Sequence, residues 1–261
     1  MQVEILKKNT YSMITIQEAK TKKEMKQFIM FPFELYKNDK TWVPPLIFDE
    51  KNTFNPRKNP SFEFCEAAFF LAFKDNKVVG RIAAIINHKA NETWNEKRTR
   101  FGWIAFIDDP DVSKALLDTA EKWGADKGMT GIHGPLGFTD LDPEGMQVEG
   151  FENNATITSA HNYPYFPVHM EKHGFRKSVD WVQYKFNASQ PIPEKVARIN
   201  KLIAQKYKVN TVVPKTKKEA MKYVPGFFKG VNEGFKNLYG YSQLSDKQIK
   251  YYTDAYFGFA R

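Results

Sequence analysis

Two apolar, β-rich runs stand almost back to back in this chain and define its first structural unit. Residues 67–73 and residues 78–86 are separated only by Lys74-Asp-Asn-Lys77. A short polar spacer between two such runs is the plainest β-hairpin signal in the chain. The hairpin predicts an antiparallel pair at the centre of a sheet, so the remaining segments are interpreted by how they extend or cover it.

The segments before the hairpin predict a strand and then a helix. Residues 14–17 alternate like a short strand, and Thr21-Lys-Lys-Glu24 has the form of a capping box that opens a helix running towards Tyr36. A connection rich in proline and asparagine follows, from Trp42 to Pro60, and we expect it to lack regular structure.

The segments after the hairpin alternate between strand and helix. Residues 101–107 predict a strand, and Asp109-Pro110 fits an N-cap followed by proline at the first helical position, with helical spacing up to Gly128. Three further elements follow: a strand over 132–136, a helix from Pro167 to Gly174, and an alternating strand over 180–186. The whole order predicts an α/β chain with a mixed sheet and helices packed on it.

Composition and charge indicate the compartment of the protein and the part of the chain that is basic. The single cysteine, Cys65, looks like a buried small apolar residue, no signal-peptide layout precedes the first strand, and the apolar runs are far shorter than the roughly 20 residues that span a bilayer. We therefore expect a cytoplasmic protein with no membrane partner. Residues 1–184 carry 24 Lys or Arg against 25 Asp or Glu, whereas residues 185–261 carry 15 against 5. The formal charge of +9 thus belongs to the C-terminal segment.

A five-residue repeat suggests two domain copies. Lys20-Thr-Lys-Lys-Glu24 recurs as Lys215-Thr-Lys-Lys-Glu219, each time between a strand-like stretch and a helical pattern, and Ser245-Asp-Lys-Gln248 adds a further capping box. We expect an extension over 1–13, a domain over 14–186, a linker or helix over 187–208, and the opening of a second domain over 209–261. Either that second copy is cut short, or the segment is a helical tail that packs back on the first domain.

The order strand, helix, hairpin, strand, helix, strand, helix, strand is similar to that of the GNAT superfamily of acyl-CoA N-acyltransferases. Segments such as Val79-Gly-Arg-Ile-Ala-Ala84 and Asp108-Asp-Pro-Asp-Val112 resemble an uncharacterised bacterial GNAT-like subfamily whose longer members carry two such domains in tandem. The resemblance covers residues 14–186. It implies a GNAT-like fold, followed here by a mainly helical C-terminal segment, with acetyl-CoA as cofactor and N-acetyltransferase activity.

Two features that the resemblance implies are missing. The family's phosphate loop, Q/R-x-x-G-x-G/A, holds the CoA pyrophosphate on backbone N–H groups at a helix N-terminus, but this chain reads Ile107-Asp-Asp-Pro-Asp-Val112 there. Proline removes one donor, and three aspartates repel a diphosphate. A tyrosine general acid, frequent in the family before Glu-Lys-x-Gly-Phe, is replaced by Met170. Acetyl-CoA binding by this domain is therefore disfavoured, while Asn162 resembles the family's cofactor-side asparagine.

The glycine- and proline-containing segment from 134 to 165 gathers the remaining candidate site residues. A ligand pocket there would use Glu149 as base or anchor and Tyr163 as acid or hydrogen-bond donor, with Asp142, His161 and Tyr165 contacting a small-molecule ligand or acyl acceptor. An ordinary polar loop is the alternative interpretation.

Other groups have weaker patterns. His169 and His173 lie four apart, but without further ligands we interpret them as surface histidines, and we expect no metal. The lysines of the C-terminal segment alternate with apolar residues as on an amphipathic helix, so nucleic acid is not the expected partner.

Three functions remain open at this point. The chain is an N-acyltransferase-family protein whose N-terminal domain is degenerate for CoA and acts as a substrate-side or structural partner, a non-catalytic GNAT-like module that binds a small ligand or a protein, or a polyanion-binding protein through its basic end. The sequence leaves the acyl acceptor and the oligomeric state open.

Overall fold

The computed structural model describes residues 13–157, 159–187 and 189–256, and we call its described residues up to 175 the body and those from 176 onward the tail. The body begins with β1 (Thr15–Glu18), α1 (Lys22–Leu35), α2 (Ile47–Thr53) and the short 3-10 helix η1 (Pro60–Glu63), and continues with β2 (Cys65–Lys74), β3 (Lys77–Asn87), α3 (His88–Thr93), β4 (Arg98–Phe106), α4 (Pro110–Ala125), β5 (Gly131–His133) and α5 (Tyr165–Lys172). The tail holds α6 (Glu194–Tyr207), α7 (Lys217–Ala220), α8 (Val224–Phe235) and α9 (Asp246–Tyr256).

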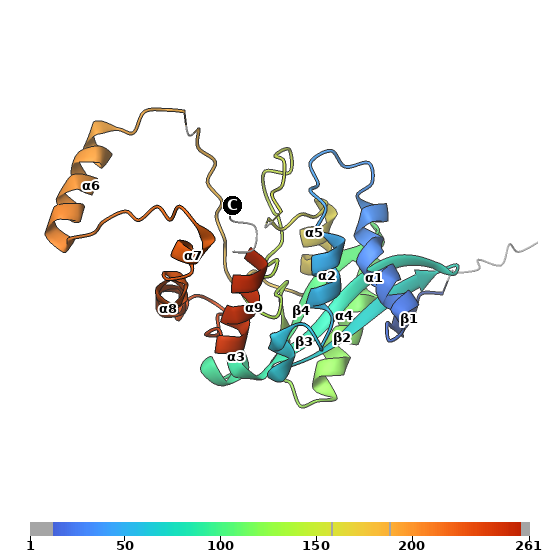
Figure 1. Ribbon diagram of the computed structural model, residues 1–261. Coiled ribbons are helices and arrows are strands. Elements are labelled where there is room, and N and C mark those ends of the chain that lie inside the picture. The colour runs from blue at the N-terminus through green and yellow to red at the C-terminus, as the bar shows by residue number, and fades with distance from the viewer. Residues whose placement is uncertain (1–12, 158, 188, 257–261) are drawn as a thin grey trace, which may run out of the picture.

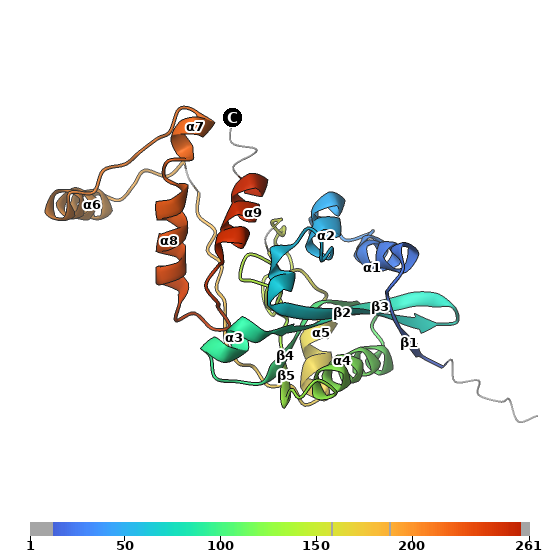
Figure 2. The ribbon, with the colours of Figure 1, turned by 60° about the horizontal axis from the view of Figure 1, so that its bottom comes forward.

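One five-stranded sheet in the order β1-β2-β3-β4-β5 forms the centre of the body. The first four strands are antiparallel neighbours, and β5 pairs parallel to β4. Figures 1 and 2 show α1 and α2 on one face of this sheet and α4 and α5 on the other. The mixed α/β sheet is thus confirmed, and the expected strands and helices from β1 to α5 occur in the expected order, with α2, η1 and α3 added between them.

Successive side chains of β2 and β3 alternate between the two faces of the sheet, and both faces are apolar. Phe70 and Ile82 face α4 and α5, where they pack with Leu116 and Phe166, while the neighbouring Phe69 faces α1 and packs with Phe28. Because both sides are covered, β2 and β3 are apolar on nearly every residue, which explains why their sequence lacks a polar face.

The local start and stop signals form as the sequence predicts. Thr21 and Glu24 make both bonds of the capping box of α1, and Asp109 caps α4 with Pro110 at the first helical position. Asp75 and Asn76 turn the β2–β3 hairpin with φ angles of 51° and 61°, a left-handed conformation that these residue types tolerate. The capping box of Ser245 and Gln248 opens α9.

Several expected elements differ from the structure. The proline-rich connection contains α2 and leads into η1. The run of α2 lies between Pro45 and Pro56, and Pro60 stands at the first position of η1, where its missing N–H costs no hydrogen bond. The strand expected over 132–136 ends at His133. The strand expected over 180–186 is not formed: the segment finds no described strand to pair with, and Val182, Tyr184 and Phe186 are exposed.

The second copy of the repeat keeps its cap but not its context. Thr216 accepts a hydrogen bond from the Glu219 N–H, yet α7 ends after four residues, and no strand precedes it among the described residues. The expected N-terminal extension and the last residues of the chain lie outside the described part.

The end of the tail contacts the body. Gln248 Nε2 donates to Ser61 Oγ (3.1 Å), Tyr252 and Thr139 share a hydrogen bond (2.8 Å), and Trp94 Nε1 donates to the Tyr241 carbonyl (2.8 Å).

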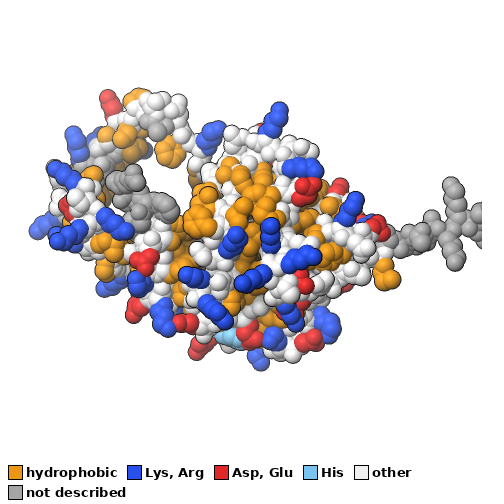
Figure 3. All heavy atoms as spheres, turned by 45° about the vertical axis from the view of Figure 1, so that its right-hand side comes forward, with side chains coloured by type: hydrophobic (Ala, Val, Ile, Leu, Met, Phe, Trp, Pro, Cys, Tyr) orange, Lys and Arg blue, Asp and Glu red, His pale blue; other side chains and the backbone are white. Residues whose placement is uncertain are grey.

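No helix in the described ranges is long and apolar enough to cross a membrane. Figure 3 shows hydrophobic side chains gathered on one face of the molecule, with Lys and Arg side chains among and below them.

Candidate functional site

A cavity of about 140 Å³ lies where β4 and β5 separate. The two strands pair only from Arg98 with Gly131 to Arg100 with His133. The Phe101 carbonyl still accepts from the Leu136 N–H (2.8 Å), and no described strand pairs with β4 on that side further along. The cavity is lined from α1, α2 and α5, from the connection before α2, from β3 and β4, and from the loop between Pro135 and Asn162. The sheet therefore opens a pocket at the end of its shortest strand.

A bulge in β4 shapes the wall of this cavity. Arg81 and Ala83 of β3 pair with Ala105 and Gly102, so β4 contains one extra residue there. Trp103 takes a φ of 45° in this bulge, which is uncommon for a large side chain. Trp103 lines the cavity with other apolar side chains: Trp42, Val43, Ile104, Met146, Ile157 and Phe166.

His161 and Asp39 form a buried pair at the cavity. His161 Nε2 lies 3.0 Å from Asp39 Oδ2, and the two side chains are 7% and 13% exposed. Burial acts to raise the pKa of Asp39, but hydrogen bonds from Thr41 and His161 outweigh it and lower the pKa. The ionised carboxylate holds the Nε2 proton, and His161 Nδ1 is buried with no hydrogen-bond partner among the described residues. Its lone pair is free to accept a proton from a bound group.

Glu50 and Arg81 supply a second buried pair to the same cavity. Arg81 Nη1 lies 3.7 Å from Glu50 Oε2, within ion-pair range but too long for a hydrogen bond, and it donates instead to the Phe28 carbonyl (2.8 Å). Trp103 Nε1 donates to Glu50 Oε1 (3.3 Å). Burial raises the pKa of Glu50 and lowers that of Arg81, each partly offset by the other's charge. Glu50 Oε2 is left able to accept a hydrogen bond from a ligand.

The residues expected from the sequence are only partly brought together. His161 and Asn162 line the cavity. Asn162 acts as a brace, because its amide accepts from the Gln147 N–H (2.7 Å) and donates to the Gln147 carbonyl (3.0 Å). These bonds fix the loop that carries His161.

The two tyrosines expected in the site donate hydrogen bonds to backbone carbonyls. Tyr163 donates to the Leu35 carbonyl (3.3 Å) and Tyr165 to the Phe106 carbonyl (2.6 Å). Burial raises the pKa of both hydroxyls. Their protons therefore serve to attach α5 to α1 and β4.

Asp142 and Glu149 lie outside the residues that line the cavity. The Asp142 carboxylate points inward and accepts from the Thr139 N–H (3.0 Å), and burial raises its pKa to about 7. Glu149 is exposed. Neither Glu149 nor Tyr163 is among the residues that line the cavity.

The N-terminus of α4 is already occupied by the chain itself. Asp109 Oδ1 accepts from the Asp111 N–H (3.0 Å), the Asp109 carbonyl accepts from Val112 and Ser113, and Lys74 pairs with Asp109 Oδ2 (2.8 Å). Pro110 has no N–H to offer. These residues do not fit a CoA diphosphate at this helix end.

Beside this helix end, Ser113 and two histidines form a hydrogen-bonded cluster. Ser113 Oγ lies 2.9 Å from His169 Nδ1, 2.8 Å from His173 Nε2 and 3.0 Å from the Pro110 carbonyl. His169 Nε2 lies 2.9 Å from Asp108 Oδ1. The expectation of a surface His169 was wrong, since the residue is 4% exposed. No group of three or more His, Cys, Asp or Glu within the described ranges is arranged to hold a metal ion.

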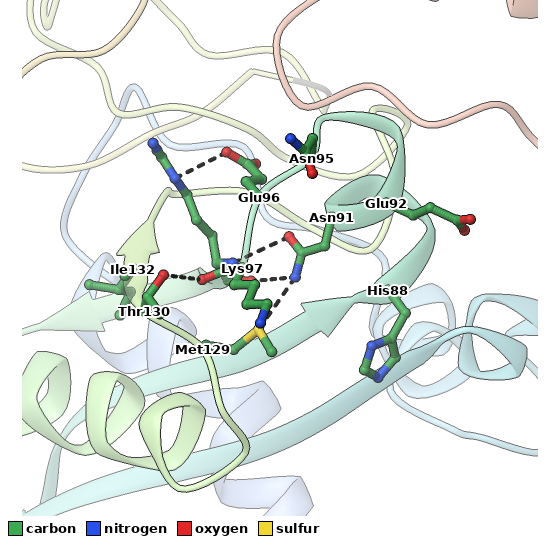
Figure 4. A pocket seen from close by; sticks show the side chains of 11 residues that line it. His88, Asn91, Glu92, Asn95, Glu96, Lys97, Met129, Thr130 and Ile132 are labelled. Atoms are coloured by element: carbon green, nitrogen blue, oxygen red, sulfur yellow. Dashed lines mark hydrogen bonds and ion pairs between the residues drawn. The ribbon is translucent and has the colours of Figure 1, made fainter.

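A larger and more open cavity of about 850 Å³ runs between α3, the start of β4 and the outer edge of β5. Figure 4 shows the side chains that line it, with Asn91 and Glu96 among those joined by dashed lines. Asn91 Nδ2 donates to the Arg98 carbonyl (3.0 Å), and Arg98 Nε pairs with Glu96 Oε2 (3.0 Å). It contains none of the expected site residues. The smaller cavity, with its unpaired His161 and Glu50 atoms, is the better candidate site.

Sequence reasoning missed Asp39, Glu50 and Arg81. Asp39 lies just before the proline-rich connection and Glu50 lies within it, on α2, and neither belongs to a motif. Arg81 carries a usable signal, because it is a charged residue inside the apolar run 78–86. A charge in a buried strand requires a buried partner, and Glu50 is that partner.

No family model matches the chain. Among curated proteins, it is 35% identical over 166 residues to Protein YghO from Escherichia coli, covering 62% of this chain and 42% of that protein. It is 32% identical over 187 residues to a bacterial ceramide synthase from Caulobacter vibrioides, covering 71% of this chain and 49% of that protein. The chain thus spans less than half the length of either relative.

Among solved structures, the chain is similar to a predicted acetyltransferase with acetyl-CoA from Clostridium acetobutylicum. The two share 11% sequence identity at a TM-score of 0.40, and the match covers 66% of this chain and 96% of that one.

Proposed function

We propose that the body of this chain binds the amine of an acyl acceptor in an N-acyl transfer, and that His161 accepts the proton of that amine. The observation that carries the proposal is the buried, unpartnered His161 Nδ1 at the cavity, with the opposite ring nitrogen held by Asp39. The sequence alone favours Glu149 as base or anchor of a pocket in this loop. The proposal moves that role to His161 because Glu149 is exposed and does not line the cavity.

The chemistry follows from the state of the amine. An alkyl amine is protonated at neutral pH, and it needs a free lone pair before it can be acylated. His161 Nδ1 takes up that proton, and the Asp39 carboxylate stabilises the imidazolium that forms. Glu50 Oε2 accepts a further hydrogen bond from the acceptor, while Arg81 keeps the buried Glu50 carboxylate paired.

The acceptor class is a long-chain amino alcohol. One relative is a ceramide synthase, and a ceramide is an amide of such an amine. A cavity of about 140 Å³ holds only the small polar head of the molecule. The apolar Val43 lines the cavity, and the exposed Leu46, Ile47 and Phe48 follow it in the chain, which gives the aliphatic part an apolar surface to lie on.

The proposal does not use the N-terminus of α4 for CoA. Its donors are taken by Asp109, and Pro110 supplies none. The support for a substrate-side body is therefore twofold: an occupied helix end and an open acceptor cavity.

The test is a titration of the full chain with a long-chain amino alcohol, followed by tryptophan fluorescence, because Trp42 and Trp103 line the cavity. Binding is expected, and His161→Gln should weaken it about tenfold or more by removing the proton acceptor. Glu149→Gln is the matched control and should change nothing. A His161→Gln chain that binds as tightly as the unaltered one would contradict the proposal.

A parallel titration with CoA separates the alternatives. Weak or absent CoA binding is expected, and tight binding abolished by changes at Asp109 would show that α4 does hold the cofactor. Amine binding that depends on His161, without amide formation when acyl-CoA is supplied, would favour the non-catalytic ligand-binding alternative, which the occupied α4 end also supports.

A further inference from the structure

Helix α6 stands away from the rest of the described molecule. In Figures 1 and 2 it lies at the far end of a long excursion of the chain, separate from the body and from α8 and α9. From residue 191 to residue 210 every residue is exposed except Ala204, which is half-buried. The helix thus has no partner among the described residues.

The exposed surface of α6 includes a continuous apolar stripe. Val196, Ile199, Ile203 and Tyr207 recur at intervals of three or four residues, and Leu202 borders them. These side chains are between 42% and 64% exposed. A stripe at this spacing is the face that an amphipathic helix buries, so α6 is built for a surface that lies outside the described residues.

The charge around the stripe is strongly positive. Residues 185–218 contain nine Lys or Arg and a single acidic residue, Glu194. On α6 itself, Arg198 and Lys201 lie on the side opposite the stripe, and Lys195 and Lys206 lie near its ends. Figure 3 shows many Lys and Arg side chains on the projecting part of the tail at the left of the view, with hydrophobic side chains between them. The surface that fits α6 must accept both apolar side chains and cations.

We infer that α6 docks in the plane of an anionic lipid surface. Apolar side chains on such a helix enter the acyl boundary while Lys and Arg meet the negative headgroups. A helix of 14 residues is only about 21 Å long, shorter than the roughly 30 Å hydrocarbon core, so it lies on the bilayer and does not span it. A nucleic acid would satisfy the lysines but leave the aliphatic stripe in water.

This inference goes beyond the sequence analysis, which expected no membrane partner, and it does not depend on the proposed acyl transfer. Surface docking needs neither a spanning helix nor the cavity at β4 and β5. His161→Gln should therefore leave lipid binding unchanged, so the two proposals can fail separately.

The experiment is co-sedimentation of the full chain with phosphatidylcholine vesicles, with and without phosphatidylglycerol. Binding is expected to the vesicles that contain phosphatidylglycerol, with a marked loss on raising the salt concentration. The double variant Ile199→Glu, Ile203→Glu should lower the apparent affinity about tenfold or more by placing charges in the apolar stripe. Circular dichroism checks that the variant keeps its fold, as expected for exposed positions.

A matched control carries the same charge change on the body. Val148→Glu with Val168→Glu replaces two exposed apolar residues that are 58% and 61% exposed and should reduce binding far less. Equal loss in both double variants, or no binding to phosphatidylglycerol vesicles, overturns the inference. So does binding to duplex DNA without vesicle binding, which would favour a polyanion, or a dimer that the α6 variant abolishes, which would assign the stripe to a second copy of this chain.

Discussion

Helices α1 and α6 are both 14 residues long and both amphipathic, yet they differ in what covers them. Helix α1 buries Phe28, Ile29, Phe31 and Pro32 against the sheet, whereas α6 buries no residue within the described part of the chain. The two sequences follow the same periodic rule. The comparison teaches that periodicity indicates which face a helix would bury but not whether a partner is present.

The largest expected effect tests this contrast with one leucine on α4, another helix covered by the sheet, and one leucine on α6. Leu116 of α4 is fully buried, and Leu202 of α6 is 58% exposed. Leu116→Ala should lower the free energy of unfolding by about 4 kcal/mol, through lost burial and a cavity, and Leu202→Ala by less than about 0.5 kcal/mol. Urea denaturation of both variants measures the difference. Similar losses would mean that α6 is packed in solution and would break the comparison.

A pH effect on stability is expected from His133, which joins the body to Tyr239 of the tail through its Nδ1 atom (3.0 Å). Burial, aided by Arg100 and Arg98, lowers the pKa of His133 from 6.5 to about 3. Between these values the unfolded chain takes up a proton that the folded chain refuses, so stability is lost as pH falls. The loss should be on the order of 3 kcal/mol, since each pKa unit contributes about 1.4 kcal/mol and relaxation offsets part of it.

Thermal or urea unfolding at several pH values measures this loss. His133→Gln should remove most of it, because glutamine does not titrate. His88→Gln, at a half-exposed histidine of α3, is the control and should leave the loss in place. An unchanged pH profile in His133→Gln would show that other groups cause the acid sensitivity.

Replacement by alanine should change the free energy of unfolding with opposite signs at two helix glycines. A Cβ at Gly124 of α4 would lie 1.7 Å from the Thr99 hydroxyl, whereas a Cβ at Gly230 of α8 would meet no atom within 4 Å. Gly124→Ala should therefore cost about 2 kcal/mol of stability, and Gly230→Ala should add up to about 1 kcal/mol through helix propensity. Denaturant midpoints of the two variants decide this. A destabilised Gly230→Ala chain would place an unexpected contact on the tail.

The smallest expected effect on stability compares two glutamines of the tail, one buried and one exposed. Gln248 of α9 is 1% exposed and bonded to Ser61, while Gln205 of α6 is exposed. Gln248→Ala should cost about 1 kcal/mol by removing a buried hydrogen bond and part of a helix cap. Gln205→Ala should be close to neutral. The same unfolding assay applies, and a neutral Gln248→Ala would mean that α9 does not dock on the body.

Local features were predictable from the sequence, and non-local ones were not. The β2–β3 hairpin and the caps at Thr21, Asp109 and Ser245 each depend on residues within one turn, and each forms as expected. The segment 180–186 has the alternation of a strand, but a strand also needs a neighbour to pair with, and the sequence does not encode that locally.

The candidate site was predictable only in part for the same reason. His161 stood out as a titratable residue in a loop, but its partner Asp39 lies 122 residues earlier in the chain. His169 was expected at the surface because the sequence shows no further metal ligand beside the pair His169 and His173, whereas Phe106 and Tyr165 lie against its ring in the fold. Tertiary packing decides which polar residues are buried together.

The Ser113 hydroxyl has too few hydrogens to donate to all of the groups that it contacts. It has one hydrogen but three neighbours, the Pro110 carbonyl and one nitrogen from each of His169 and His173. That single hydrogen can be donated to only one of the three neighbours, so a ring nitrogen that contacts the Ser113 oxygen without receiving it must donate a hydrogen of its own. The tautomers of two histidines and the direction of one O–H bond at the start of α4 therefore change together as a single unit.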